Sequence, residues 1–154
     1  MQRDSEDEVI DAVMSASRAL LAVVARSVAA VDEDVTLPQY RALVVLAQHG
    51  PRRPVDLAVA LAVTPSTATR MCDRLVARGL AVRERVAEDR REVQVLLSDR
   101  GRDLVDEVTR RRRTELAGLL GALSAAQRSL VVQALRTFAA AAGEVPEPDW
   151  AVVA

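Results

Sequence analysis

The chain has 154 residues, with 21 basic and 22 acidic side chains and a formal charge of −1, and every basic residue is Arg. This length suits one domain that buries its own core. A charge near zero excludes a histone-like protein, while a single Cys and a single His exclude an internal disulfide and a zinc cluster of sulfur and nitrogen ligands.

The charge is distributed unevenly along the chain. Residues 1–50 carry a net −4, residues 51–113 a net +5 and residues 114–154 a net −2. A basic middle segment points to an anionic partner. The acidic start lacks the basic residues of a signal peptide, and the apolar stretch 20–31 is too short to span a bilayer. We therefore expect a cytoplasmic protein without a membrane partner.

The first two predicted helices follow from apolar spacing and from an N-cap signal. Apolar residues recur every three or four positions over residues 6–31, which predicts one long helix with a single apolar face. Thr36 is a suitable N-cap for a second helix, since Pro38 falls in its first turn. That helix is expected to end at Gly50.

The next two helices form a helix-turn-helix pattern. Pro54 opens a short third helix, and Thr64 followed by Pro65 repeats the N-cap signal. The fourth helix is predicted from residue 65 to about residue 78, with Gly79 well placed to end it. A short helix, a tight turn and a second helix are typical of this motif.

Beyond this motif the spacing of apolar residues changes from helical to alternating, and then becomes helical again. Alternating residues predict short strands at 82–86 and 93–97, joined by a polar turn, and two such strands after a helix-turn-helix make a wing. Ser98 caps a predicted fifth helix, residues 99–123. Ser124 and Gln127 form a capping box that opens a sixth helix, ending near residue 142.

The fourth helix has two chemically different faces. Ala68, Met71, Cys72 and Leu75 fall within one arc, whereas the rest of the helix carries hydroxyl and charged side chains, with Thr67 at the border. The first turn of a second helix is the part that reaches base edges in helix-turn-helix complexes. The candidates for base reading are Ser66, Thr67 and Arg70, and those for phosphate contact are Thr69 and Arg74. The alternative is a surface helix whose polar face is merely solvated.

Several segments share the order and spacing of one protein family. They are residues 37–40, 54–58, 63–70, 73–80 and 93–98, Gly101, and the wing turn Asp89-Arg90-Arg91. Through them, residues 7–142 resemble the MarR family of winged-helix regulators. The fold class is therefore expected to be mainly α with a small β-wing.

The resemblance implies an architecture and a function. It implies a single domain over residues 1–154, with a winged helix-turn-helix DNA-binding region at 36–98 and a tail at 143–154. Residues 6–35 and 99–142 would be the dimerisation helices of a homodimer. The implied function is sequence-specific binding of double-stranded DNA by a transcriptional regulator, expected to be a repressor.

The wing turn has a specific implied role. Arg91 would enter a minor groove, where a narrow A·T-rich groove concentrates negative potential. Asp89 would orient that Arg through a charge-assisted hydrogen bond, and Arg90 would share or replace its role. The alternative is a generic charged hairpin turn.

The sequence does not favour a redox role for Cys72 or a metal-binding role for His49. Cys72 falls on the packing face of the fourth helix, where a thiol is usually inert, and His49 suits the end of the second helix. Arg112 falls within an apolar stripe, so it should meet an acid or an anionic ligand.

Family members often respond to small aromatic or phenolic effectors that bind between the dimerisation helices and the winged region. That cleft would here involve Tyr40, Arg41 and Arg112, although Tyr40 is expected to be a core residue rather than a contact to the effector. No cofactor is implied, and the absence of a catalytic set of residues argues against an enzyme. The competing hypothesis is a helical dimeric interaction module that does not bind DNA.

Overall fold

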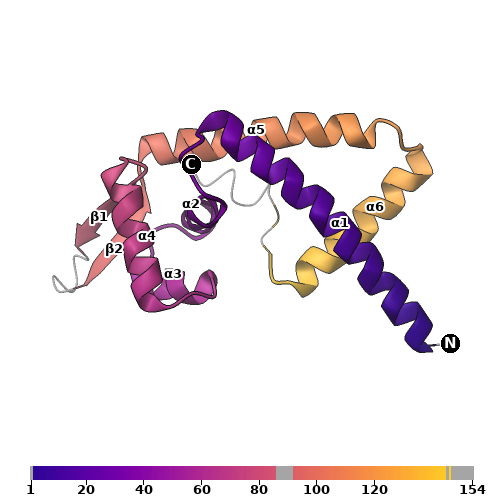
Figure 1. The fold of residues 1–154 in the computed structure, drawn as a ribbon, viewed down its shortest axis with the longest axis horizontal. Coiled ribbons are helices and arrows are strands. Elements are labelled where there is room, and N and C mark those ends of the chain that lie inside the picture. Colours follow the sequence, from indigo (N-terminus) through magenta and orange to yellow (C-terminus); the bar gives the residue numbers. More distant parts are fainter. Residues whose placement is uncertain (1, 86–91, 145, 147–154) are drawn as a thin grey trace.

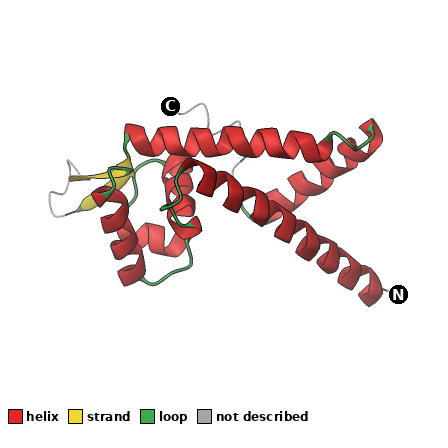
Figure 2. Cartoon of the chain, turned by 45° about the horizontal axis from the view of Figure 1, so that its top comes forward, coloured by secondary structure: helices red, strands yellow, loops and turns green. Residues whose placement is uncertain are grey.

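The computed structural model describes residues 2–85, 92–144 and 146. Over these residues the chain is mainly helical with a small two-stranded sheet, which confirms the expected fold class (Figure 1, Figure 2). The elements in chain order are α1 (Gln2–Val31), α2 (Leu37–His49), α3 (Pro54–Ala60), α4 (Pro65–Ala77), β1 (Ala81–Arg85), β2 (Val93–Leu97), α5 (Asp99–Leu120) and α6 (Ala125–Ala141).

The helices begin at the hydroxyl residues that the sequence predicts as N-caps. The Thr36 hydroxyl accepts a hydrogen bond from the Gln39 amide at 3.4 Å, and the Gln39 side chain accepts one from the Thr36 amide at 2.9 Å. This reciprocal capping box, which the sequence analysis did not recognise at α2, satisfies two backbone donors at the helix start. The predicted N-caps Thr64, Ser98 and Ser124 are also confirmed.

Three boundaries differ from their predictions. The first helix begins at Gln2, before the predicted start at residue 6. The first strand begins at Ala81 rather than at residue 82, because buried Ala81 pairs with Leu97 in the ladder. Helix α5 ends at Leu120 rather than at residue 123, since Gly121 follows it and glycine has low helix propensity.

The sheet has an additional backbone contact that the sequence did not indicate. Strands β1 and β2 are antiparallel, and Arg52, in the turn before α3, forms an isolated bridge with Val95 of β2. The Arg52 amide donates to the Val95 carbonyl at 2.9 Å, and the Val95 amide donates to the Arg52 carbonyl at 2.8 Å. The base of the wing is thereby fixed to the chain segment that opens α3.

One core joins these elements. Leu43 of α2, Leu57 of α3, Leu75 of α4 and Val95 of β2 are fully buried in it. Helix α5 contributes its first half, and α1 contributes residues near its carboxyl-terminal end. Residues 36–98, which we call the winged unit, therefore pack against only part of α1 and α5.

The outer helices leave apolar side chains exposed. Helix α5 runs from the winged unit to the turn at residues 121–124, and α6 folds back from there (Figure 1). Helix α6 has no buried residue in the single chain. Its exposed apolar residues, with those of α1, include Val9, Ile10, Met14, Leu21, Leu130, Leu135 and Phe138. None of the described helices has the length and hydropathy needed to cross a membrane.

Candidate nucleic-acid interface

A tight turn sets α4 across α3. Helix α3 is capped at Leu61, and the next residue, Ala62, has a positive φ of 52°. The Ala62 amide donates to the Val59 carbonyl at 3.1 Å, and the Val63 amide to the Ala58 carbonyl at 3.0 Å. The two helices pack directly on each other. This arrangement confirms the predicted helix-turn-helix.

The two faces of α4 are as predicted. Ala68, Met71, Cys72 and Leu75 are its buried residues, and Cys72 is 2% exposed. Burial raises the pKa of the Cys72 thiol, which disfavours the reactive thiolate. The opposite face is exposed, with Thr67 half-buried at the border; it carries Ser66, Thr69, Arg70, Asp73 and Arg74.

Hydroxyl groups at the start of α4 form a local network. The Thr64 hydroxyl lies 2.9 Å from the Thr67 hydroxyl and 3.1 Å from that of Ser66. The Thr69 hydroxyl donates to the Pro65 carbonyl at 2.9 Å. These bonds fix the hydroxyl groups in place and leave oxygen lone pairs available to a donor.

Arg70 and Arg74, the two arginines of this exposed face, are not held by bonds within the described residues as the hydroxyl groups are. Within the described part of the chain, neither Arg70 nor Arg74 forms an ion pair or hydrogen bond. Both line a groove of about 320 Å³ between α4 and the first turn of α2, where Pro38 and Gln39 form the other wall. Two guanidinium groups without an acidic partner make this groove suitable for an anion.

Ion pairs connect the wing to the helices beside it. Arg83 of β1 pairs with Asp73 of α4 at 2.5 Å. Arg53 donates to Asp56 at 2.8 Å and to Glu92, just before β2, at 2.9 Å. The hydrogen bonds that Arg53 donates to these carboxylates raise the pKa of Arg53, and the bond from Arg53 lowers the pKa of Asp56. The predicted wing residues Asp89, Arg90 and Arg91 lie outside the described residues.

A second candidate site lies on the other side of α2. Tyr40, Arg41 and Arg112, which the sequence analysis grouped, line one pocket of about 280 Å³, with apolar walls from Leu21, Val24, Leu37 and Val44. Tyr40 is also a core residue, 5% exposed. The Tyr40 hydroxyl and Arg112 Nε are buried without a hydrogen-bond partner among the described residues, and Arg41 pairs with Glu144.

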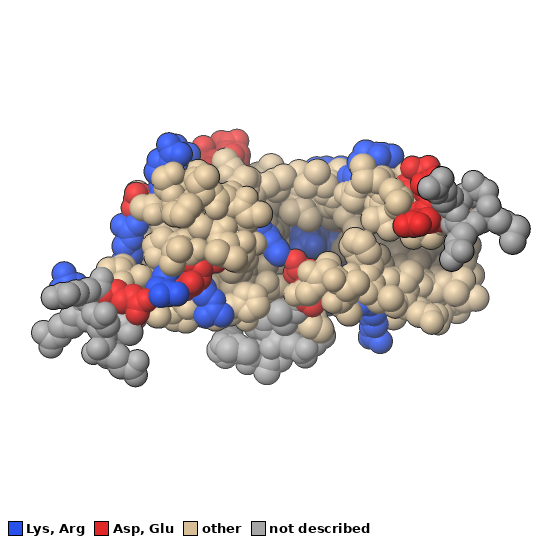
Figure 3. Space-filling view, turned by 90° about the horizontal axis from the view of Figure 1, so that it is seen from below, with Lys and Arg blue, Asp and Glu red and all other residues tan. Residues whose placement is uncertain are grey.

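Charged side chains occur at both ends of the face shown in Figure 3. Basic and acidic side chains lie close together at the end formed by the winged unit, and further charged side chains lie over the outer helices. His49 is exposed as the last residue of α2. Within the described ranges, no group of three His, Cys, Asp or Glu residues could hold a metal ion.

Comparison with known proteins decides the family. A model of the MarR family matches residues 33–92. The helix-turn-helix transcriptional regulator Mb0904 of Mycobacterium bovis is 33% identical over 112 residues, which cover 73% of this chain and 78% of that protein. The chain belongs to the MarR family. It is a DNA-binding transcriptional regulator of the winged helix-turn-helix repressor type, and not an enzyme.

Other relatives are similar in sequence and fold. RV1404 of Mycobacterium tuberculosis is 45% identical, with a TM-score of 0.87 over 93% of this chain and 97% of that chain. The transcriptional repressor NicR of Pseudomonas putida is 34% identical over 70% of this chain and 68% of that protein. BpsR of Bordetella bronchiseptica, whose DNA binding is regulated by 6-hydroxynicotinic acid, is 28% identical, with a TM-score of 0.63 over 86% and 98% of the two chains.

Sequence reasoning missed the contacts that hold this interface together. Arg52 and Arg53 contact residues at or just before β2, far along the chain, and Arg83 connects β1 to α4. Thr36 and Gln39 form part of the groove beside Arg70. A capping-box signal was available at Thr36 and Gln39 in the sequence. For the ion pairs no local signal exists, because each partner is one of many similar charged residues.

Proposed function

We propose that this MarR-family regulator represses transcription by binding, as a homodimer, a two-fold symmetric operator in double-stranded DNA. In this proposal the winged unit, residues 36–98, is the DNA-binding region, and residues 6–35 and 99–142 are the dimerisation helices. Residues 143–154 are a tail of the same single domain, residues 1–154. We place this regulator in the cytoplasm.

The observation that carries the proposal is the exposed face of α4. Arg70 and Arg74 have no acidic partner in the described chain, and both side chains line a groove open to an anion. We assign Ser66, Thr67 and Arg70 to base edges in the major groove, since Arg reads guanine bidentately and hydroxyl groups bond to bases. We assign Thr69 and Arg74 to phosphates, which fix register rather than sequence.

The wing completes the proposed interface. The ion pairs of Arg53 and Arg83 support a wing whose base is fixed relative to α4. In the proposal Arg91 enters the adjacent minor groove, Asp89 orients it, and Arg90 shares or replaces its role. This assignment rests on the family motif at Asp89-Arg90-Arg91.

Exposed apolar side chains on the outer helices support the homodimer. They include Val9, Ile10, Met14 and Leu21 of α1 and Leu130, Leu135 and Phe138 of α6. Large exposed apolar patches mark protein interfaces. A two-fold dimer would present two α4 helices to half-sites about 34–36 Å apart.

A small aromatic or phenolic acid is the proposed effector. The pocket at Tyr40, Arg41 and Arg112 has apolar walls and two buried polar atoms without partners, which suits a flat ring with a polar substituent. The relation to BpsR, which responds to 6-hydroxynicotinic acid, supports this class of ligand. Binding there would release the operator.

Footprinting on the DNA upstream of the protein's own gene tests the proposal. We expect a protected site with two-fold symmetry, with affinity falling steeply as salt increases. Arg70→Ala should cost about 1–3 kcal/mol of binding free energy and relax preference at one base pair of each half-site. Arg74→Ala should weaken binding to all sequences alike and reduce the salt slope by about 1.

The competing hypothesis makes a different forecast. An interaction module without DNA binding would give no footprint in that region or in a genome-wide search of bound DNA. Its association with a protein partner would not show the slope produced by counterion release.

A further inference from the structure

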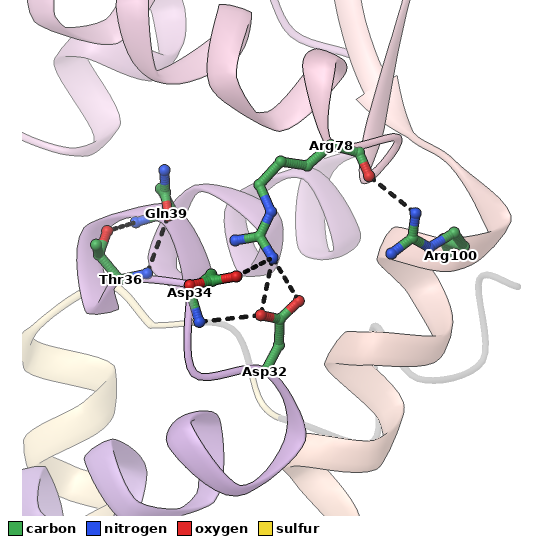
Figure 4. A network of polar contacts seen from close by, with 6 residues as sticks. All are labelled: Asp32, Asp34, Thr36, Gln39, Arg78 and Arg100. Atoms are coloured by element: carbon green, nitrogen blue, oxygen red, sulfur yellow. Dashed lines mark hydrogen bonds and ion pairs between the residues drawn. The ribbon is translucent and has the colours of Figure 1, made fainter.

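The carboxyl-terminal end of α4 is held at a junction with α1 and α5 (Figure 4). Arg78, the C-cap residue of α4, donates from Nη2 to both carboxylate oxygens of Asp32, each at 2.8 Å. The same nitrogen lies 3.9 Å from a carboxylate oxygen of Asp34. The backbone carbonyl of Arg78 accepts a hydrogen bond from Arg100 of α5 at 3.0 Å.

The residues around this contact reinforce it. The Ser98 hydroxyl, at the start of α5, donates to the Gly79 carbonyl at 2.6 Å. Asp32 directly follows α1, and its carboxylate also accepts the Asp34 amide at 3.1 Å, which shapes the loop before α2. The end of α4 is therefore bonded to the end of one predicted dimerisation helix and to the start of another.

The Asp32–Arg78 pair is better shielded than the ion pairs that Arg26, Arg41, Arg53, Arg83, Arg110 and Arg111 form. Its side chains are 28% and 20% exposed for Arg78 and Asp32, whereas each other pair has at least one side chain exposed by half or nearly so. Partial burial alone would raise the pKa of Asp32, but hydrogen bonds from Arg78 and from the Asp34 amide outweigh it, and the pKa is lowered. Asp32 is thus held as a charged partner, and shielded charge-assisted bonds are stronger than exposed ones.

The Asp32–Arg78 pair lies at the opposite end of α4 from the residues that we assign to DNA contact. Twelve residues separate Arg78 from Ser66, which corresponds to about 18 Å along a helix. A tilt of about 10° about Arg78 would displace the first turn by about 3 Å, close to the rise of one base pair, ~3.4 Å. In a two-fold dimer both helices would be displaced.

We propose that Arg78, through Asp32, is a positioning residue that sets the angle of α4 and thereby the half-site spacing that the dimer accepts. The proposal rests on the proposed function, because it needs a dimer on a two-fold operator. It assigns to Arg78 a role in discriminating between operators, although its side chain contacts protein rather than DNA.

Operators of altered spacing test this role. The probe is the duplex that the wild-type protein selects from a randomised double-stranded library, together with versions lengthened or shortened by one central base pair. Wild type should prefer the selected spacing strongly. Arg78→Gln should reduce that preference by about ten-fold, the scale of coupling between contacting residues. Arg102→Gln, which removes the same charge from an exposed position of α5, should keep the wild-type preference.

Further variants separate positioning from general destabilisation. Asp32→Asn should reduce the preference as Arg78→Gln does, and the double variant should lose no more than either single variant. If Arg78→Gln does not fold, Arg78→Lys keeps the charge without the planar fork and should still show reduced discrimination. A folded variant with the full wild-type spacing preference would overturn the inference. Failure of wild type to select any symmetric duplex would overturn the proposed function itself.

Discussion

Arg83 of β1 and Asp73 of α4 form an ion pair between the wing and α4, with Nη2 of Arg83 2.5 Å from Oδ1 of Asp73. Asp73 lies on the exposed face of α4, beside Arg74, where an unpaired carboxylate would repel phosphates. The pair neutralises that carboxylate and joins two elements that are both expected to contact DNA. One charge of the wing strand is thereby committed to the protein rather than to the operator.

Asp73→Asn should therefore release Arg83 to DNA. We expect stronger binding to non-specific duplex at low salt, and a plot of log affinity against log salt that is steeper by about 0.9, the contribution of one added phosphate contact. Fluorescence anisotropy over a salt series measures this. Asp103→Asn removes an acid from an exposed position of α5 and serves as the control. A slope equal to that of wild type would show that Arg83 does not reach DNA.

Arg91→Ala should weaken operator binding and relax sequence preference at positions flanking the α4 contacts. The reason is that a guanidinium in a narrow minor groove reads groove width and potential, which depend on A·T content. Selection of duplexes from a randomised library by wild type and variant compares their preferences. The wing assignment is wrong if the variant binds as tightly as wild type and selects the same flanks.

Tyr40→Phe should stabilise the free protein and weaken binding of the effector. The Tyr40 hydroxyl is buried without a partner in the described chain, so its removal should raise the free energy of unfolding by about 1 kcal/mol and Tm by about 3 °C. Thermal unfolding at matched protein concentration tests the first part. Calorimetry with 6-hydroxynicotinic acid tests the second, and unchanged ligand affinity would remove Tyr40 from the proposed site.

Phe138→Glu should disrupt the homodimer. Phe138 is 53% exposed on the apolar face of α6, and a charge buried there in a dimer would lack a partner. Light scattering after size-exclusion chromatography should show a monomer, with a large loss of operator affinity. Ser129→Glu adds the same charge at an exposed position about 180° around α6 from Phe138 and should remain dimeric. A dimeric Phe138→Glu protein would place the interface elsewhere.

Asp32→Asn should change the pH dependence of stability. The pKa of Asp32 is lower in the folded protein than the unfolded value of about 3.9, so the stabilisation is fully present above about pH 5 and is lost as pH falls through the folded pKa. The variant should be less stable than wild type by about 1 kcal/mol at pH 7, and the difference should be smaller at about pH 3. Urea unfolding at several pH values measures this. An equal difference at both pH values would mean that Asp32 stabilises by packing rather than by charge.

The local part of the fold could be predicted because local residues determine it. Thr36, Thr64 and Ser124 cap helices through bonds to residues three positions later, and this pattern is visible in sequence. The buried face of α4 was likewise predictable, since Ala68, Met71, Cys72 and Leu75 recur with the helical period.

Contacts between distant elements could not be predicted in this way. Asp32 and Arg78 are 46 positions apart, and Arg41 and Glu144 are 103 apart. Any of the 21 arginines could have been the partner of either acid until the core had fixed the arrangement of helices. The grouping of Tyr40, Arg41 and Arg112 came from family resemblance, because periodicity on separate helices does not say which faces meet.

Helix α6, which buries no residue within its own chain, makes the amount of protein part of its folding equilibrium. If a second copy covers its apolar face, the fraction of competent molecules depends on total concentration, and near the dissociation constant it falls as the protein is diluted. Repression would then respond more than proportionally to changes in expression. Dilution during cell growth would act on the operator without any effector being bound.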